Sequence, residues 1–298
     1  MDAEKLPPIA TKRKRRVPDM RSPRLRTQLL SPSALGQAYE AATTDVTTAG
    51  WQPLLRSADG DNFPALQLLR ARARDIARNG TGAGVIRKMV DHVVGHRGLV
   101  AQSRLDPELF GGNEETAREA ERQIEKTLKR WARRVDVGGE HSWCSFQRLA
   151  FRSMLESGDV GINITAIPGN DLALEVLEAD RIKTPPKARI TDRIREGVER
   201  NAAGVPVRYW VTVVHPGDPY TLRPGSWALE YRGVERFNPQ TGRPQFLLLF
   251  EPLRPEQSRG VPIFSSCAHI FDHKAEGLKA ALYVARTAAM LAFKVTRE

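Results

Sequence analysis

Three carboxylates near the middle of the chain come closest, in type and spacing, to a set that could do chemistry. They are Asp159, Glu178 and Asp180, with Lys183 close behind. On an extended strand Glu178 and Asp180 share one face and could hold Mg²⁺ for hydrolysis of a nucleic acid. The spacing is unspecific, because "LEAD" (177–180) equally fits a strand that ends in a turn. We therefore name no catalytic and no metal-binding residue, and keep a magnesium-dependent nuclease as an alternative.

The cysteines offer a second and weaker possibility of a metal site. Cys144 and Cys267 are far apart in the sequence, which does not indicate a disulfide framework. Cys267 is followed by His269 and His273, but structural zinc normally needs a second pair of ligands at regular spacing. The motifs G-x-S-x-G and H-E-x-x-H are also absent from the sequence. We expect two small buried thiols, no metal, no cofactor and no enzymatic activity.

Basic residues dominate the charge of the chain. Its 298 residues include 46 Lys and Arg against 35 Asp and Glu, a formal net charge of +11. Such a balance indicates a nucleic acid, an anionic surface or an acidic protein as partner. Residues 1–30 carry much of the excess and are too polar to bury a core. They include one basic run, which consists of Lys12, Arg13, Lys14, Arg15 and Arg16. This run either contacts phosphates or belongs to a solvated tail.

A second group of basic residues lies on a predicted helix at 61–80. Arg70, Arg74 and Arg78 recur every four residues, so they form one ridge on that helix. The ridge could contact a DNA backbone or an acidic partner, or it could be a solvated face. The glycines at 80, 82 and 84 follow this arginine-rich helix rather than a buried strand. They therefore predict a turn between two helices, not a nucleotide-binding loop.

The order of the predicted elements indicates an α+β fold. Helical patterns come first, at 61–80, 80–95, 113–136 and 145–159. Apolar and alternating runs rich in β-branched residues then predict strands at 160–167, 172–180, 207–214 and 245–250. We expect a helical N-terminal region followed by a mainly antiparallel sheet, ending in a long α-helix.

The last predicted helix, 271–298, is the longest helical pattern in the chain. Leu278, Leu282 and Phe293 belong to an apolar seam, and Val284 lies off that seam. We therefore expect neighbours on several sides of this helix. No glycine or proline closes it, which suggests that the element continues beyond residue 298. The chain has no apolar run near the roughly 20 residues of a membrane span, so we expect no membrane association.

Several short stretches along the chain together resemble a known protein family, although no single one of them is specific. They are "YEAA" (39–42) followed by Trp51; "LRARARDIARNG" (69–80) with "VVG" (93–95); "RSMLESGDV" (152–160); "LEADRI" (177–182); "REGVERNAAGVPVRYWV" (195–211) with "HPGD" (215–218); and "RPEQSRGVP" (254–262). Together they resemble the lambda-type family of tailed-bacteriophage portal proteins, over roughly residues 35–298.

The resemblance implies a structural protein of the virion, assembled in the host cytoplasm. Members of the family form a ring, typically a dodecamer, at one vertex of the capsid. Double-stranded DNA is driven through the channel of that ring by the terminase motor, and the tail later attaches there. The expected partners are therefore further copies of the chain, DNA, and capsid, scaffold and head-completion proteins. A simple DNA-binding protein that acts through the basic arm remains a further alternative.

The resemblance also divides the chain into three parts. Residues 1–34 would be a disordered basic arm, residues 35–265 a wing-like α+β domain, and residues 266–298 the first stem helix, incomplete at its C-terminus. Family members continue into a clip, a second stem helix and a crown. We therefore expect terminase to be contacted only through C-terminal parts that this chain lacks.

Residues 254–262 would form a stiff connector between the wing and the stem. Pro255 and Pro262 restrict its backbone, and Gly260 permits a sharp turn. Glu256 stands where the family pattern leads us to expect glycine. The polar side chains of the connector would be free to bond a neighbouring subunit; they are Arg254, Gln257 and Arg259.

Overall fold

The structure is a computed structural model that describes residues 50, 53–188, 193–218 and 230–291. The chain divides into two units, Met1–Leu55 and Arg56–Glu298. Only four residues of the first unit are described, so the fold below is that of the second. The predicted basic arm, with its run at 12–16, and Phe293 at the other end lie outside the described residues.

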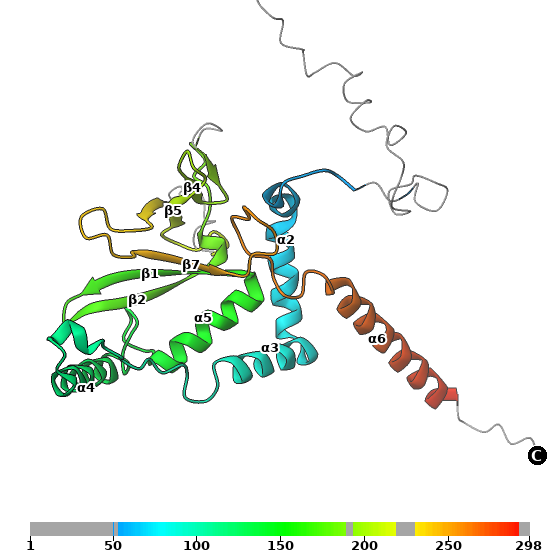
Figure 1. Cartoon of the computed structure of the whole chain (residues 1–298). Helices are drawn as coiled ribbons and strands as arrows, with labels where there is room; N and C mark the ends of the chain where they lie inside the picture. Colours follow the sequence, from blue (N-terminus) through cyan, green and yellow to red (C-terminus); the bar gives the residue numbers. More distant parts are fainter. Residues whose placement is uncertain (1–49, 51–52, 189–192, 219–229, 292–298) are drawn as a thin grey trace, which may run out of the picture. The chain divides into compact units, whose positions relative to one another are not determined.

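Helices precede strands in the second unit, as the sequence predicts (Figure 1). The helical part comprises α2 (Ala58–Arg78), α3 (Gly80–Val93), the 3₁₀-helix η3 (Pro107–Phe110), α4 (Glu114–Trp131) and α5 (Trp143–Ser157). After the strands the chain continues into α6 (Ala268–Leu291). The prediction of an α+β fold that ends in a long helix is confirmed.

The strands form two antiparallel sheets rather than the single sheet that the pattern indicated. One has the order β2-β1-β7 and the other the order β3-β4-β5-β6. Their bounds are β1 (Asp159–Ile167), β2 (Asn170–Glu178), β3 (Ile194–Arg195), β4 (Val198–Arg200), β5 (Pro206–Thr212), β6 (Tyr231–Glu235) and β7 (Phe246–Phe250). The sequence pattern missed β3 and β4 because runs of two and three residues are too short to show a period, and it missed β6 because "YRGVE" has no apolar run like that of β7.

The junction between α2 and α3 is the single residue Asn79, so the glycines at 80, 82 and 84 lie in the first two turns of α3 and not, as predicted, in a turn between the helices. A Cβ on Gly82 would sit 2.2 Å from the Ile76 carbonyl oxygen, closer than any side chain could tolerate. The backbones of α2 and α3 therefore meet only because this residue is glycine.

Three apolar clusters hold the elements together. The first joins α2, α3 and α5 to the segment before α6, through Ala73, Ile86 and Phe264. The second lies between the two sheets, where the rings of Tyr209 and Phe246 stack with centroids 4.6 Å apart. The third packs α5 against β1 and β2 and includes Phe146, Val160 and Leu174. Asp159, the first residue of β1, thus lies where the helical part meets the sheets.

Candidate functional site: a buried arginine–aspartate cluster under the connector

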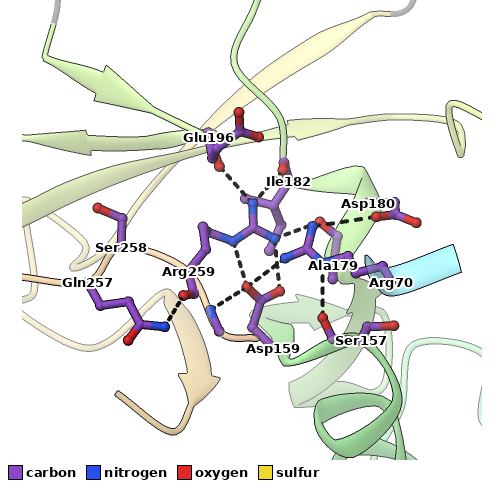
Figure 2. Close-up of polar contacts among 12 residues, drawn as sticks. Arg70, Ser157, Asp159, Ala179, Asp180, Ile182, Glu196, Gln257, Ser258 and Arg259 are labelled. Carbon is purple, nitrogen blue, oxygen red and sulfur yellow. Dashed lines mark hydrogen bonds and ion pairs between the residues drawn. The ribbon is translucent and has the colours of Figure 1, made fainter. Parts of the chain in front are cut away.

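The guanidinium group of Arg259 is the centre of a buried polar cluster (Figure 2). Its side chain is 0% exposed, and each of its five N–H bonds has an acceptor. Nε and Nη2 donate to the two oxygens of Asp159, at 2.7 and 2.8 Å. The other three donate to the carbonyl oxygens of Ala179, Ile182 and Glu196, each at 2.7 Å. A planar fork bonded in this way fixes both the position and the orientation of the connector.

Asp159 receives the guanidinium at the junction between α5 and β1. Besides the two bonds from Arg259, its Oδ2 accepts from Arg70 Nη2 and from the Gly260 backbone N–H, both at 3.0 Å. The carboxylate is 0% exposed and accepts four hydrogen bonds, about as many as its two oxygens can take. Gly158, just before it, ends α5 with a φ of +88°, which turns the chain directly from helix into strand.

Helix α2 contributes two further arginines to the cluster, Arg70 and Arg74. Arg70 is buried and also donates from Nε to the Ser157 carbonyl oxygen, at 2.9 Å. Its Nη1 lies 3.5 Å from Asp180, which also accepts a hydrogen bond from Arg74. Two carboxylates therefore face three guanidinium groups, of which only that of Arg74 is partly exposed. Each of these three guanidinium groups contacts at least one of the two carboxylates, so none of the three lacks an acidic partner.

The two fully enclosed arginines respond differently to this environment. Burial lowers the pKa of Arg70, and the neighbouring charge of Arg259 lowers it further, against the attraction of Asp159 and Asp180. Burial acts in the same direction on Arg259, but the attraction of Asp159 and the hydrogen bonds to it raise the pKa of Arg259 overall. The bidentate pair between Arg259 and Asp159 is therefore the stronger of the two contacts with this carboxylate.

The connector is also tied to the start of α2. The buried carboxylate of Asp59 accepts from the backbone N–H and the hydroxyl of Ser258, at 2.8 and 2.7 Å. Arg200 of β4 donates to the same hydroxyl oxygen at 3.0 Å. Gln257 is buried as well, and its side-chain oxygen accepts from the backbone N–H groups of Leu253 and Arg254. The connector therefore bonds to α2, β1, β4 and its own backbone.

Two glycines let the connector lie directly on the α5–β1 junction. A Cβ on Gly260 would be 1.9 Å from the Gly158 carbonyl oxygen, and a Cβ on Gly158 would be 2.5 Å from the Val261 carbonyl carbon. Neither position has room for a side chain. The turn that we expected at Gly260 is a close approach of two backbones, with the Arg259–Asp159 pair beside it.

The structure corrects part of the predicted contact surface. Arg259 and Gln257 are not free to bond a neighbouring subunit, because both are buried and bonded within their own chain. Arg70 is likewise enclosed, so it cannot contact DNA. Periodicity placed it on an exposed ridge, but periodicity cannot distinguish a solvated arginine from one that meets a buried carboxylate.

The other predicted contact residues keep some exposure. Arg74 is partly exposed although it bonds Asp180, and Arg78 is exposed at the end of α2. Arg254 is half-exposed and donates to Asp61, 2.5 Å away, and to the Arg56 carbonyl oxygen. Contacts of these three arginines with another molecule remain a prediction.

The three acidic residues of the nuclease hypothesis are bonded to basic side chains of the same chain. Asp159 and Asp180 are occupied by guanidinium groups, and Glu178 lies on the exposed side, 3.1 Å from His215. Among the described residues no group of three or more His, Cys, Asp or Glu is placed to hold a metal ion, and this includes Cys267 with His269. The geometry gives no support to the magnesium-dependent alternative.

Beyond the connector, α6 has apolar side chains that are exposed to solvent in the monomer. Its first turns pack against the core through Phe271, but Leu278 is 64%, Leu282 58% and Val284 69% exposed. These side chains point in more than one direction around the helix, as the sequence predicts. In the described part of the chain no helix has both the length and the apolar character that crossing a membrane requires.

The family model described as "Phage portal protein, lambda family" matches residues 33–298. The chain belongs to the lambda family of phage portal proteins. Three relatives agree: a probable portal protein of Halomonas phage phiHAP-1, the portal protein of Escherichia phage N15 and portal protein B of Escherichia phage lambda. They are 27%, 28% and 27% identical to it, over 86%, 73% and 72% of the chain. The same alignments cover 49%, 41% and 40% of the relatives, so the chain spans about half their length or less.

Membership in the portal family agrees with the motifs on which the resemblance was based. Two of them, "RSMLESGDV" and "RPEQSRGVP", contain Asp159 and Arg259 and meet in the buried cluster. The sequence identified these two stretches as motifs of the family, but it did not predict that they contact each other. A signal for the contact was present in "SGDV", where an acid lies between a helix-ending glycine and a buried strand.

Proposed function

We propose that this chain forms the wing and the beginning of the first stem helix of a portal ring. The ring would lie at one capsid vertex of the virion, and phage DNA would be packaged and ejected through its channel. One observation carries the proposal: α6 packs against the core at its start, while apolar side chains are exposed along its remaining length. A helix of this kind is stable in water when other copies cover it.

The exposed side chains of α6 offer substantial free energy for assembly. Complete burial of a leucine or valine side chain contributes about 1.5–3 kcal/mol. More than half of each of Leu278, Leu282 and Val284 remains to be buried, so each offers about 1 kcal/mol per copy. In a closed ring this contribution recurs at every subunit contact, which suits an assembly of identical copies.

The buried cluster gives the helix a fixed direction. The connector leads into α6 and is bonded to α2, to the α5–β1 junction and to the turn between β3 and β4. Because these bonds lie within one chain, each subunit would present its α6 at the same angle before assembly. Uniform angles allow a ring to close rather than to grow as an open filament.

The remaining partners follow from the portal assignment. We expect a dodecamer, assembled in the host cytoplasm, whose wing contacts capsid, scaffold and head-completion proteins. Residues 1–34 would be the basic arm, 35–265 the wing domain and 266–298 the start of the stem. Terminase would be contacted through C-terminal parts of the portal protein and not through the wing. The chain would act through geometry and charge, with no reaction and no cofactor of its own.

Substitutions on α6 test the proposal. In Leu278→Lys/Leu282→Lys, two charges replace two exposed apolar side chains, so the folded monomer should keep its melting temperature within about 2 °C. Light scattering coupled to size exclusion should show a multi-subunit species for the unaltered chain and a monomer for the double variant. Lys279→Gln changes an exposed residue of the same helix and should leave the assembly intact. A variant that assembles like the unaltered chain would contradict the role given to α6.

A further inference from the structure

A groove of about 1070 Å³ lies between α4, the turn that follows it and the tip of the β1–β2 hairpin. Its floor is apolar and includes Ile124, Leu128, Val137 and Leu172. Three of these remain substantially exposed: Ile124 at 46%, Val137 at 41% and Leu172 at 43%. Single exposed apolar residues are ordinary, but a group of them that lines one hollow marks a contact surface.

The groove is held open by bonds between α4 and the hairpin. The indole N–H of Trp131 donates to the Leu172 carbonyl oxygen at 2.6 Å. Beyond it, the Val137 N–H donates to the Leu174 carbonyl oxygen at 3.0 Å, and the Leu174 N–H donates to that of Val135 at 2.8 Å. These main-chain bonds extend the edge of β2 and fix α4 beside the sheet. A partner would therefore meet a preformed surface.

One side of the groove is strongly basic. Arg130 lines both the groove and a second hollow on the adjacent face of α4. The further basic residues of that second hollow form a ridge, spaced three to four apart: Arg122, Lys126, Lys129 and Arg133. Its acidic member, Glu125, lies 3.6 Å from Lys129. Asp136 also lines the groove, but its Oδ1 accepts the His141 backbone N–H at 2.7 Å.

We propose that this groove binds an acidic segment of another protein, one that carries an apolar anchor between carboxylates. The anchor would cover Ile124 and Val137 while the carboxylates face Arg130 and the ridge beyond it. A nucleic acid would use the ridge but would leave the apolar floor without a partner. A second copy of this chain is a separate outcome of the test described below. The proposal needs no ring and goes beyond the portal assignment.

A peptide selection tests the proposal. Full-length chain would be used to select binders from a display library of random 16-residue peptides, and the most enriched ones would be titrated by fluorescence anisotropy. Enriched peptides should be acidic and contain Leu, Ile, Phe or Trp. Ile124→Ser should weaken their binding about tenfold. Arg130→Gln should weaken it about threefold and reduce its dependence on salt.

Arg118→Gln is the matched control. It removes one positive charge from the same helix, but Arg118 pairs with Glu114 and lines neither hollow, so binding should stay within twofold. Neutral or basic selected peptides would overturn the proposal, as would binding unchanged in Ile124→Ser. A 16-base-pair DNA duplex that displaces the peptides and is itself lost in Arg130→Gln but not in Ile124→Ser would assign the face to nucleic acid. Dimerisation that Ile124→Ser abolishes would assign it to a second copy.

Discussion

Arg259→Met is the substitution that most sharply tests the role of the buried cluster. Methionine fills most of the volume but has no donor, so it isolates the five hydrogen bonds from the packing. The carbonyl oxygens of Ala179, Ile182 and Glu196 would each lose a buried partner, at a cost of about 1 kcal/mol apiece. Asp159 would keep Arg70 but lose its bidentate contact, which adds about 1–2 kcal/mol.

The expected loss in the free energy of unfolding is therefore about 4 kcal/mol, within the range of about 3–5 kcal/mol for breaking a buried ion pair. In a domain of this size the melting temperature should fall by about 8–16 °C. Urea denaturation followed by circular dichroism would measure the free energy, and differential scanning calorimetry the melting temperature.

Two further variants test whether the loss of stability in Arg259→Met comes from the buried hydrogen-bond geometry of the guanidinium. Arg254→Met removes a guanidinium from the same connector, but the Arg254 pair with Asp61 is half-exposed and should contribute less than about 1 kcal/mol. Arg259→Lys keeps the charge and loses the planar fork, so its cost should be about 2–3 kcal/mol. The reasoning would be refuted if Arg259→Met cost no more than Arg254→Met, or if lysine restored full stability.

Four further predictions concern the connector, the basic arm and the acidic residues of the nuclease alternative. Glu256 has a φ of +62°, where glycine is favoured, so Glu256→Gly should stabilise the fold by about 0.5 kcal/mol in urea denaturation; a loss of stability would contradict this reading of the turn. Gly260→Ala should destabilise it by at least about 2 kcal/mol, because its Cβ would collide with the Gly158 carbonyl oxygen; an unchanged melting temperature would show that the two backbones separate easily. If the basic arm contacts DNA, deletion of residues 1–30 should weaken duplex binding and flatten its salt dependence, and equal affinity without the arm would end that hypothesis. Plasmid DNA with Mg²⁺ should stay intact, whereas cleavage that disappears in Asp180→Ala would revive the nuclease alternative.

The sequence predicted the elements that are long enough to show a period or that carry an unbroken apolar run, as β7 does. Helices α2, α4 and α5 and strands β1, β2, β5 and β7 were found close to their positions. The division of the strands between two sheets was missed, because pairing depends on contacts such as Asp159 opposite Phe250, which are remote in the sequence. The exposed apolar character of α6 was visible in advance, because it depends only on residue type and helical spacing.

The buried cluster was harder to predict for a physical reason. Arg70 and Arg259 have the residue type of a solvated surface, and arginine is rarely enclosed completely. Their burial depends on carboxylates that lie about 90 and 100 residues away, and no local pattern reports such a partner. Single-sequence reasoning therefore placed these arginines on contact surfaces, although it did identify the stretches that contain them.

Electron microscopy of the purified full-length chain in negative stain tests the central claim most directly. If α6 is the start of a portal stem, class averages should show closed rings with a central channel and rotational symmetry, and the rings should be absent from Leu278→Lys/Leu282→Lys. Single particles of monomer size at every concentration, with a folded chain, would contradict the account.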